Sequence, residues 1–187
     1  MLNQALASID SESFTRAYQV MRRNVMHTLY TMGNGGSAAI AEHFVCDYSK
    51  GINTDGGINP GSCGRAVSLS SNLPLITAIS NDIGYDKVFS EQLKYLQDDS
   101  ALVLAVSSSG NSPNIINGLN QAREIGYETI ALVGFDGGAV LRDDLADVIV
   151  HVNVNNYGVV EDTHHVIMHS LTQQIRTDLS QDRVLKL

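Results

Sequence analysis

A run of histidines and carboxylates near the C-terminus has the residue types that metal binding and proton transfer require. The stretch EDTHHVIMH, residues 161–169, holds two carboxylates and three of the six histidines in the chain. On a helix, spacing alone favours Glu161 with His165, or His165 with His169, because residues four apart share a face. The run offers no complete site by itself, so its role depends on partners from other elements.

A second pair with this spacing lies in the stretch HFVCD. His43 and Asp47 are four residues apart on a predicted helix, and two ligands at that spacing form half of a workable zinc site. The alternative is a buried histidine beside a surface aspartate, and spacing does not decide between them.

Two turns at predicted strand-to-helix junctions are typical of anion binding. They are MGNGGSA, residues 32–38, and VSSSGNSPNI, residues 106–115. The free amides and the dipole at a helix N-terminus bind phosphate, and small residues let the backbone approach the ligand. Neither turn continues as GK[ST] or follows G-x-G-x-x-G, so neither is a nucleotide fingerprint. Tight turns with good helix caps are the alternative.

Strands and helices alternate along the chain in the order expected for an α/β protein. Strands are predicted at 27–33, 65–71, 101–106, 128–135 and 147–154, and terminal helices at about 12–26 and 158–181. Residues 75–96 are predicted to form a short apolar segment, a polar turn at SND and a helix. Near-continuous apolar strands indicate a parallel sheet covered on both faces. We predict one doubly wound domain over residues 1–187 with about five parallel strands.

Composition limits the classes of partner. The chain has 187 residues, a net charge of −8 and a pI near 5.0, which argues against direct binding of a nucleic-acid backbone. Two cysteines are too few for a disulfide framework. No signal peptide and no apolar run long enough for a membrane span is visible. We therefore expect a cytoplasmic protein without membrane contact.

Four motifs taken together resemble one known family. They are GNGGSA…EHF, SND-IGYD-VF, SSSGNSPNII and ED–HHVIMH. Their residues are similar to those of the sugar isomerase (SIS) domain family, and their order is closest to the phosphoheptose isomerase branch. Those enzymes convert sedoheptulose 7-phosphate to a glycero-manno-heptose 7-phosphate. The resemblance covers roughly residues 14–180 and implies the three-layer SIS fold.

The resemblance implies a set of substrate contacts. It assigns a phosphate cradle to the serine-rich turn, and sugar contacts to the Asn-Gly-Gly loop, to the Asn-Asp pair and to two carboxylates. In this sequence these residues are Ser107, Ser108, Ser109, Ser112, Asn34, Gly35, Gly36, Asn81, Asp82, Asp47 and Glu161.

The resemblance also implies a divalent metal, with zinc as the first candidate. Its ligands would be His43, Asp47, Glu161 and His169, with Asp47 and His169 transferring the proton. Asp47 stands where the isomerases carry glutamate, and Glu161 where they carry glutamine. Eight residues of helix rise about 12 Å, so Glu161 and His169 reach one ion only if another subunit supplies one of them or if Glu161 precedes the helix. His165 is the reserve ligand.

Two classes of function follow from these observations. The first is an aldose–ketose isomerase of a sugar phosphate, working through an enediol(ate); the resemblance implies that it supplies heptose for surface polysaccharide. The second is a non-catalytic SIS protein that binds a sugar phosphate or a regulator such as a replication initiator. The resemblance implies a homotetramer with active sites at subunit contacts. The histidine and carboxylate set favours the enzyme, because a binding protein needs neither a base nor a metal.

Overall fold

The structure is a computed structural model that describes residues 1–52 and 64–184. Most of the glycine-rich sequence GINTDGGINPGSCG, residues 51–64, which its composition predicts to be a loop, lies outside the described residues, and so does Cys63.

Five parallel strands form one sheet, which confirms the predicted fold class. The strands are β1 (Thr28–Gly33), β2 (Ala66–Ser68), β3 (Ala101–Ser107), β4 (Glu128–Val133) and β5 (Val148–His151). They lie in the order β2-β1-β3-β4-β5, with every pairing parallel. The central strand β3 is buried along its whole length, as its uninterrupted apolar sequence predicts.

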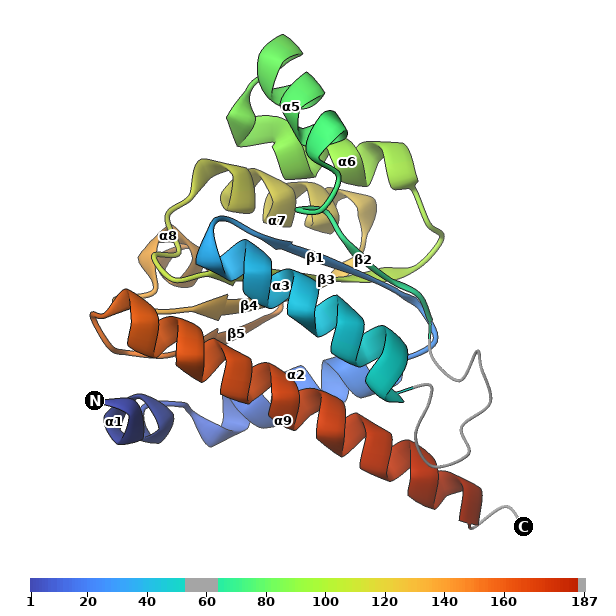
Figure 1. The fold of residues 1–187 in the computed structure, drawn as a ribbon, viewed down its shortest axis with the longest axis vertical. Helices are drawn as coiled ribbons and strands as arrows, with labels where there is room; N and C mark the ends of the chain where they lie inside the picture. Colours follow the sequence, from blue (N-terminus) through green and yellow to red (C-terminus); the bar gives the residue numbers. More distant parts are fainter. Residues whose placement is uncertain (53–63, 185–187) are drawn as a thin grey trace.

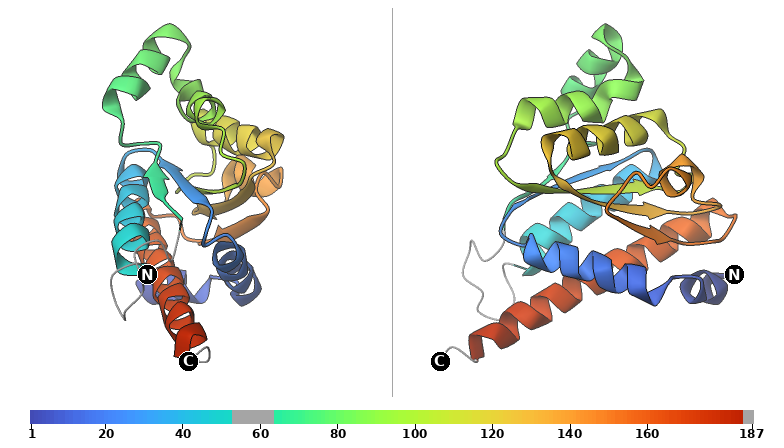
Figure 2. Two further views of the ribbon diagram at one scale, coloured as in Figure 1. Left: turned by 90° about the vertical axis from the view of Figure 1, so that its right-hand side faces the viewer. Right: turned by 180° about the vertical axis from the view of Figure 1, so that it is seen from behind.

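Helices cover both faces of the sheet. After β1 come α3 (Gly36–Cys46) and a π-helical turn, η1 (Asp47–Gly51), while α7 (Pro113–Ile125) follows β3. The left view of Figure 2 shows α3 on one side of the sheet and α7 on the other. Alternate residues of β3 enter the two cores, Leu102 and Leu104 with α3 and Val103 with α7. This period-two alternation lets β3 contact α3 on one face of the sheet and α7 on the other.

The N-terminal region differs from the expected single helix at 12–26. A short helix α1 (Leu2–Ala7) precedes α2 (Ser11–Arg23), and the side chain of Asp10 caps α2 by accepting a bond from the Ser13 amide. Helix α2 buries Val20 and Met21 in the core that also contains the last helix, α9 (Tyr157–Val184).

The segment expected as an apolar run and a polar turn is helical instead. Helix α5 (Leu73–Asp82) includes the SND triplet in its last turn, and η2 (Tyr85–Lys87) then leads into α6 (Val88–Leu96). The side chain of Asn72 accepts from the Leu75 amide at 3.2 Å, and a proline occupies the first turn. These two signals start a helix, and they outweigh the strand-like composition of LITAIS. Strand β4 is followed by a short helix, α8 (Gly138–Arg142).

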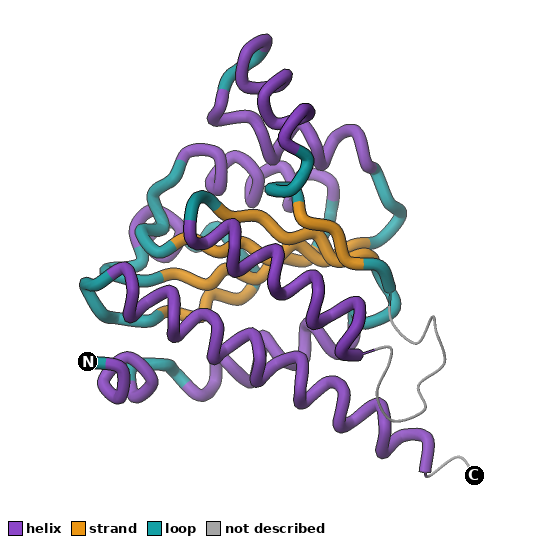
Figure 3. Tube along the Cα trace, in the orientation of Figure 1, coloured by secondary structure: helices purple, strands orange, loops and turns teal. Residues whose placement is uncertain are grey.

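Helices α3 and α9 lie side by side and run in the same direction in front of the sheet (Figures 1 and 3). Helix α9 is continuous from Tyr157, so Glu161 stands inside it. The proposal that Glu161 precedes the helix is therefore wrong, and Glu161 and His169 are separated by helical rise. No helix in the two described ranges is long and apolar enough to cross a membrane.

Candidate functional site

The serine-rich turn lies where β3 ends and α7 begins. Its conformation depends on Gly110, which has φ +62°, and the Gly110 amide donates to the Ser107 hydroxyl at 3.2 Å. A Cβ at Gly110 would lie 2.0 Å from the carbonyl oxygen of Gly137, so the turn packs directly against the backbone before α8. The side chain of Asn111 strengthens this contact by accepting from the Ala139 amide at 2.9 Å. Backbone packing thus fixes the shape of the turn.

Two hydroxyls of this turn are free to bind a ligand. Ser108 is 4% exposed, and its hydroxyl has no hydrogen-bond partner among the described residues. Ser112 is the N-cap residue of α7, yet its side chain makes no capping bond. A buried hydroxyl without a partner is uncommon and indicates a missing acceptor or donor. An anion at the α7 N-terminus would supply that acceptor.

These groups face a pocket of about 320 Å³ at the carboxyl ends of β1 and β3. It brings together most of the predicted substrate contacts. Its lining consists of Asn34, Gly35, Gly36, Ser37, Val106, Ser107, Ser108, Ser109, Ser112, Tyr157 and Glu161.

Among the residues around this pocket that were not predicted, Asn114, Tyr85 and Tyr157 make defined side-chain contacts. The amide groups of Asn34 and Asn114 exchange two hydrogen bonds of 2.8 Å, and Tyr85 donates to the Asn34 side-chain oxygen at 2.8 Å. Tyr157 lines the pocket and packs edge-on against Phe135, with ring centroids 4.6 Å apart. Tyr85 and Asn114 lie within the IGYD and SSSGNSPNII motifs, so these motifs could have identified both residues as part of the site.

The predicted Asn-Asp pair lies outside this pocket. Asn81 and Asp82 are exposed at the end of α5, and the Asn81 amide donates to the Asp82 carboxylate at 2.7 Å. Neither residue lines the pocket of its own chain.

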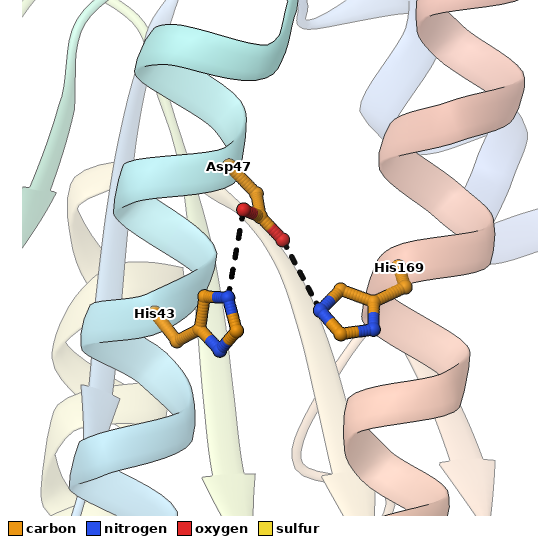
Figure 4. Close-up of side chains that lie close together, drawn as sticks. All are labelled: His43, Asp47 and His169. Carbon is orange, nitrogen blue, oxygen red and sulfur yellow. Dashed lines mark ion pairs between the residues drawn. The ribbon is translucent and has the colours of Figure 1, made fainter.

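Three of the four predicted metal ligands meet between α3 and α9. Figure 4 shows the Asp47 carboxylate between the rings of His43, from the same helical segment, and His169, from α9. The Nε2 atom of His43 lies 3.6 Å from Asp47 Oδ1, and His169 Nε2 lies 3.2 Å from Asp47 Oδ2. One ligand atom from each residue falls within 4.8 Å of the others. Two imidazoles and one carboxylate at this separation fit a zinc ion or a similar divalent metal.

The two other histidines of the run differ sharply in environment. His165 is half-buried beside the triad, and burial, with the rings of His43 and His169, lowers its pKa. His164 is fully buried, and burial lowers its pKa to about 4, against a smaller opposing effect of the Val133 backbone. His164 is therefore neutral near pH 7 and belongs to the core of the subunit.

Glu161 lies in the serine-lined pocket, apart from the triad. A Cβ built on Gly36 would meet its two carboxylate oxygens at 2.5 and 2.6 Å, so the carboxylate rests against the first turn of α3. The positive end of a helix dipole favours an anion at this place. Glu161 is not part of the group of ligand atoms within 4.8 Å formed by His43, Asp47 and His169.

The fold and the pocket define a parallel α/β domain with a serine-rich turn at the topological switch point of its sheet, between β1 and β3. The model of the SIS domain family matches residues 3–134, more than half of the chain, and the protein therefore belongs to the SIS domain family.

Its relatives lie in the phosphoheptose isomerase branch. The chain is 38% identical over 148 residues to a phosphoheptose isomerase of Aliarcobacter butzleri, covering 79% of this chain and 75% of the relative. The structure of a phosphoheptose isomerase from Neisseria gonorrhoeae superimposes with a TM-score of 0.78 at 30% identity, covering 89% and 86% of the two chains. A phosphoheptose isomerase from Francisella tularensis superimposes with a TM-score of 0.79 at 26% identity, covering 92% and 89%. The resemblance seen in the sequence is thus confirmed.

Proposed function

We propose that the protein is an aldose–ketose isomerase that converts sedoheptulose 7-phosphate to D-glycero-D-manno-heptose 7-phosphate. One arrangement carries the proposal: the serine-lined pocket and the His43–Asp47–His169 triad lie along the same pair of helices. A phosphate site alone would serve a sensor equally well. An enzyme that transfers a proton also needs a base, and here a possible base lies beside possible metal ligands.

The distance between the two sites suits a long sugar phosphate. Gly36 borders the pocket and His43 follows seven residues later, which corresponds to about 10 Å along the helix axis. An extended seven-carbon sugar with its phosphate on the last carbon spans a comparable length. With the phosphate at the serine turn, the carbonyl end of the sugar would reach the triad.

The phosphate end would be held by neutral donors. The donors would be the Ser108 and Ser112 hydroxyls and the amides at the start of α7. None of the described residues that line the pocket is a lysine or an arginine. Asn34, held by Asn114 and Tyr85, presents an oriented amide to the sugar, and Glu161 can accept bonds from sugar hydroxyls.

Isomerisation moves a proton from C1 to C2 through an enediol(ate). Asp47 and His169 are the proposed proton carriers, since their 3.2 Å contact joins a carboxylate to an imidazole. Asp47 takes the proton from C1 and returns it to C2, and His169 carries a second proton from the C1 hydroxyl to the C2 oxygen. A divalent metal bound by His43, Asp47 and His169, with zinc as the first candidate, would supply Lewis-acid stabilisation of the oxygen charge. The sequence also predicts Glu161 as a ligand, but its carboxylate lies against Gly36, outside the group of ligand atoms formed by the triad.

We further infer one SIS domain over residues 1–187 that assembles as a homotetramer in the cytoplasm. Three large apolar side chains of the protruding α5–η2 segment, Leu73, Ile83 and Tyr85, are exposed and available for a subunit contact. Asn81 and Asp82 share this segment, so a subunit contact there would offer them to a neighbouring site.

Turnover of sedoheptulose 7-phosphate by the purified protein, before and after chelation, tests this function. We expect activity that chelation abolishes and divalent metal restores. His169→Ala should lower kcat by at least about 10²-fold and leave binding of the sugar phosphate largely unchanged. Absence of turnover with any metal, together with intact sugar-phosphate binding, would instead identify a non-catalytic SIS protein.

A further inference from the structure

Tyr157 is the only aromatic side chain among the described residues that line the serine-lined pocket. It is the first residue of α9 and stands one turn before Glu161, so both side chains share the face that borders the pocket. The other lining residues are glycine, serine, asparagine, valine and glutamate, which offer hydrogen bonds but little nonpolar area. Among them, Tyr157 gives the pocket its largest nonpolar surface.

The position of the Tyr157 ring is set by Phe135, which follows β4. The two rings meet edge to face, with centroids 4.6 Å apart and an angle of 89° between their planes. This geometry is favoured because the positive edge of one ring meets the negative face of the other. Tyr157 as a whole remains 61% exposed, so the contact with Phe135 leaves much of its side chain accessible to a ligand.

Phe135 occupies an unfavourable backbone conformation. Its φ of +49° lies in the left-handed region, which bulky residues other than glycine rarely adopt. The Phe135 amide donates to the Val154 carbonyl at 3.2 Å, and the Phe135 carbonyl accepts from His151 Nε2 at 2.9 Å. These contacts hold the strained residue in place. Strain of this kind is typical of functional sites, where the direction of a side chain matters.

The residue before Phe135 ties this aromatic pair to the serine-rich turn. The Gly134 amide donates to the Ser108 carbonyl at 2.9 Å. On its other side, a Cβ at Gly134 would lie 2.4 Å from Cγ1 of Val160, which belongs to the first turn of α9. This close approach fixes the spacing between the serine-rich turn and Tyr157. Because both border one pocket, a phosphate at the turn would bring the carbon atoms next to it within reach of the ring.

We propose that Tyr157 contacts the substrate and selects for phosphate groups that carry a carbon chain, and that Phe135 is the residue that positions its ring. The inference rests on the sugar-phosphate site proposed above and adds a contact to it. The negative face of the phenol ring attracts the weakly positive C–H hydrogens of the carbons next to the phosphate. The contact also removes nonpolar surface from water. Inorganic phosphate has no such carbons and gains nothing from this contact.

Calorimetric titration of the full-length protein with two ligands tests the role of Tyr157. Sedoheptitol 7-phosphate, in which the ketone is reduced to an alcohol, keeps the carbon chain and cannot be isomerised, whereas inorganic phosphate lacks the chain. We expect Tyr157→Ala to weaken binding of sedoheptitol 7-phosphate about three- to tenfold and to change binding of inorganic phosphate less than about twofold. Tyr157→Phe keeps the ring and should bind both ligands as the wild type does. Tyr95→Ala, at a tyrosine that is 59% exposed on α6, is the matched control and should leave both affinities unchanged.

A double-mutant cycle tests the positioning role of Phe135. Phe135→Ala should weaken binding of sedoheptitol 7-phosphate in the wild-type background. It should have little further effect in a protein that already carries Tyr157→Ala, because Phe135 acts through the Tyr157 ring. Phe135→Tyr keeps an aromatic ring and should retain most of the affinity. A purely structural role would weaken binding of both ligands and would add to the effect of Tyr157→Ala.

The outcomes separate the inference from the proposed function. An unchanged affinity of Tyr157→Ala for sedoheptitol 7-phosphate, or an equal loss for both ligands, would overturn the inference and leave the phosphate site intact. Additive effects of Tyr157→Ala and Phe135→Ala would overturn the positioning role of Phe135. No binding of either ligand by the wild-type protein would overturn the sugar-phosphate site and the inference with it. Absence of turnover with normal ligand binding would overturn only the isomerase function.

Discussion

At the scale of single residues, the proposed phosphate site depends first on the side chain of Ser108. Its hydroxyl is buried and unpaired, and leaving such a group unsatisfied costs about 1–3 kcal/mol. In a stable fold this cost is tolerated where a ligand supplies the missing bond. A serine kept for packing alone would have been paired with the neighbouring backbone.

Replacement of Ser108 by alanine separates a binding role from a structural one. We expect Ser108→Ala to weaken sugar-phosphate binding about tenfold or more, because a hydrogen bond to a charged group contributes about 1.5–3 kcal/mol. The melting temperature should stay equal or rise, since the variant removes an unsatisfied buried group. Calorimetry with the sugar phosphate and thermal unfolding provide the two measurements. A lower melting temperature with unchanged affinity would assign Ser108 to the core instead.

At the scale of elements, the turn between β3 and α7 depends on a glycine for two reasons. Gly110 has φ +62°, and its Cβ would collide with the Gly137 carbonyl. Gly126, at the C-terminus of α7, has φ +92° but open space around it. Both glycines therefore have a positive φ, but only at Gly110 would a Cβ also collide with a neighbouring atom.

This pair yields a quantitative expectation. Gly126→Ala should lower the free energy of unfolding by about 1–2 kcal/mol, the cost of a left-handed conformation in an L-residue. Gly110→Ala should cost about 3 kcal/mol or more and should also weaken phosphate binding, because the turn must move away from α8. Urea unfolding and phosphate titration measure both effects. Equal losses in the two variants would mean that contact with Gly137 does not hold the turn.

A surface ion pair joins α2 to β4 and gives a pH dependence. Hydrogen bonding from Arg23, opposed by burial and assisted by Asn24, lowers the pKa of Glu128 below its ordinary value of 4.5. A lowered carboxyl pKa stabilises the folded state above the unfolded-state value, and this contribution disappears as pH falls through the folded-state pKa.

Glu128→Gln should therefore destabilise the protein near pH 7 by about 1 kcal/mol or less, because the pair is partly exposed to solvent. The difference in unfolding free energy between the variant and the wild type should shrink as pH falls through the folded-state pKa of Glu128. Urea unfolding at a series of pH values from 7 downward measures the difference, with exposed Glu124→Gln as the control for charge. A constant difference across this range would show that the Glu128 charge is not responsible.

At the scale of the whole molecule, assembly decides whether the protruding α5–η2 segment meets solvent or another chain. We expect the mass of four chains in light scattering after size-exclusion chromatography. Leu73→Asp should shift the protein toward smaller species, because Leu73 is 67% exposed on this segment and a carboxylate there opposes burial. Leu141→Asp, on α8, is the control. A wild-type protein that elutes as a single chain would contradict the tetramer.

The sequence by itself determined the fold class, the strand-end turns and the family. Long apolar strands and turn residues are local signals, so β3 and the serine-rich turn that leads from it into a helix were predicted correctly. The helical form of α5 was missed because apolar runs of this length do not distinguish a strand from a helix, while the cap at Asn72 does.

Only the tertiary structure decided which side chains meet. It brought the HFVCD pair to His169 and His165, and it placed Glu161 at Gly36, because the parallel packing of α3 on α9 sets which turns lie opposite each other. Within one chain, Asn81 and Asp82 do not line the pocket. Sequence spacing specifies which residues share a helix face, but the register between two helices follows from core packing, which no local pattern encodes.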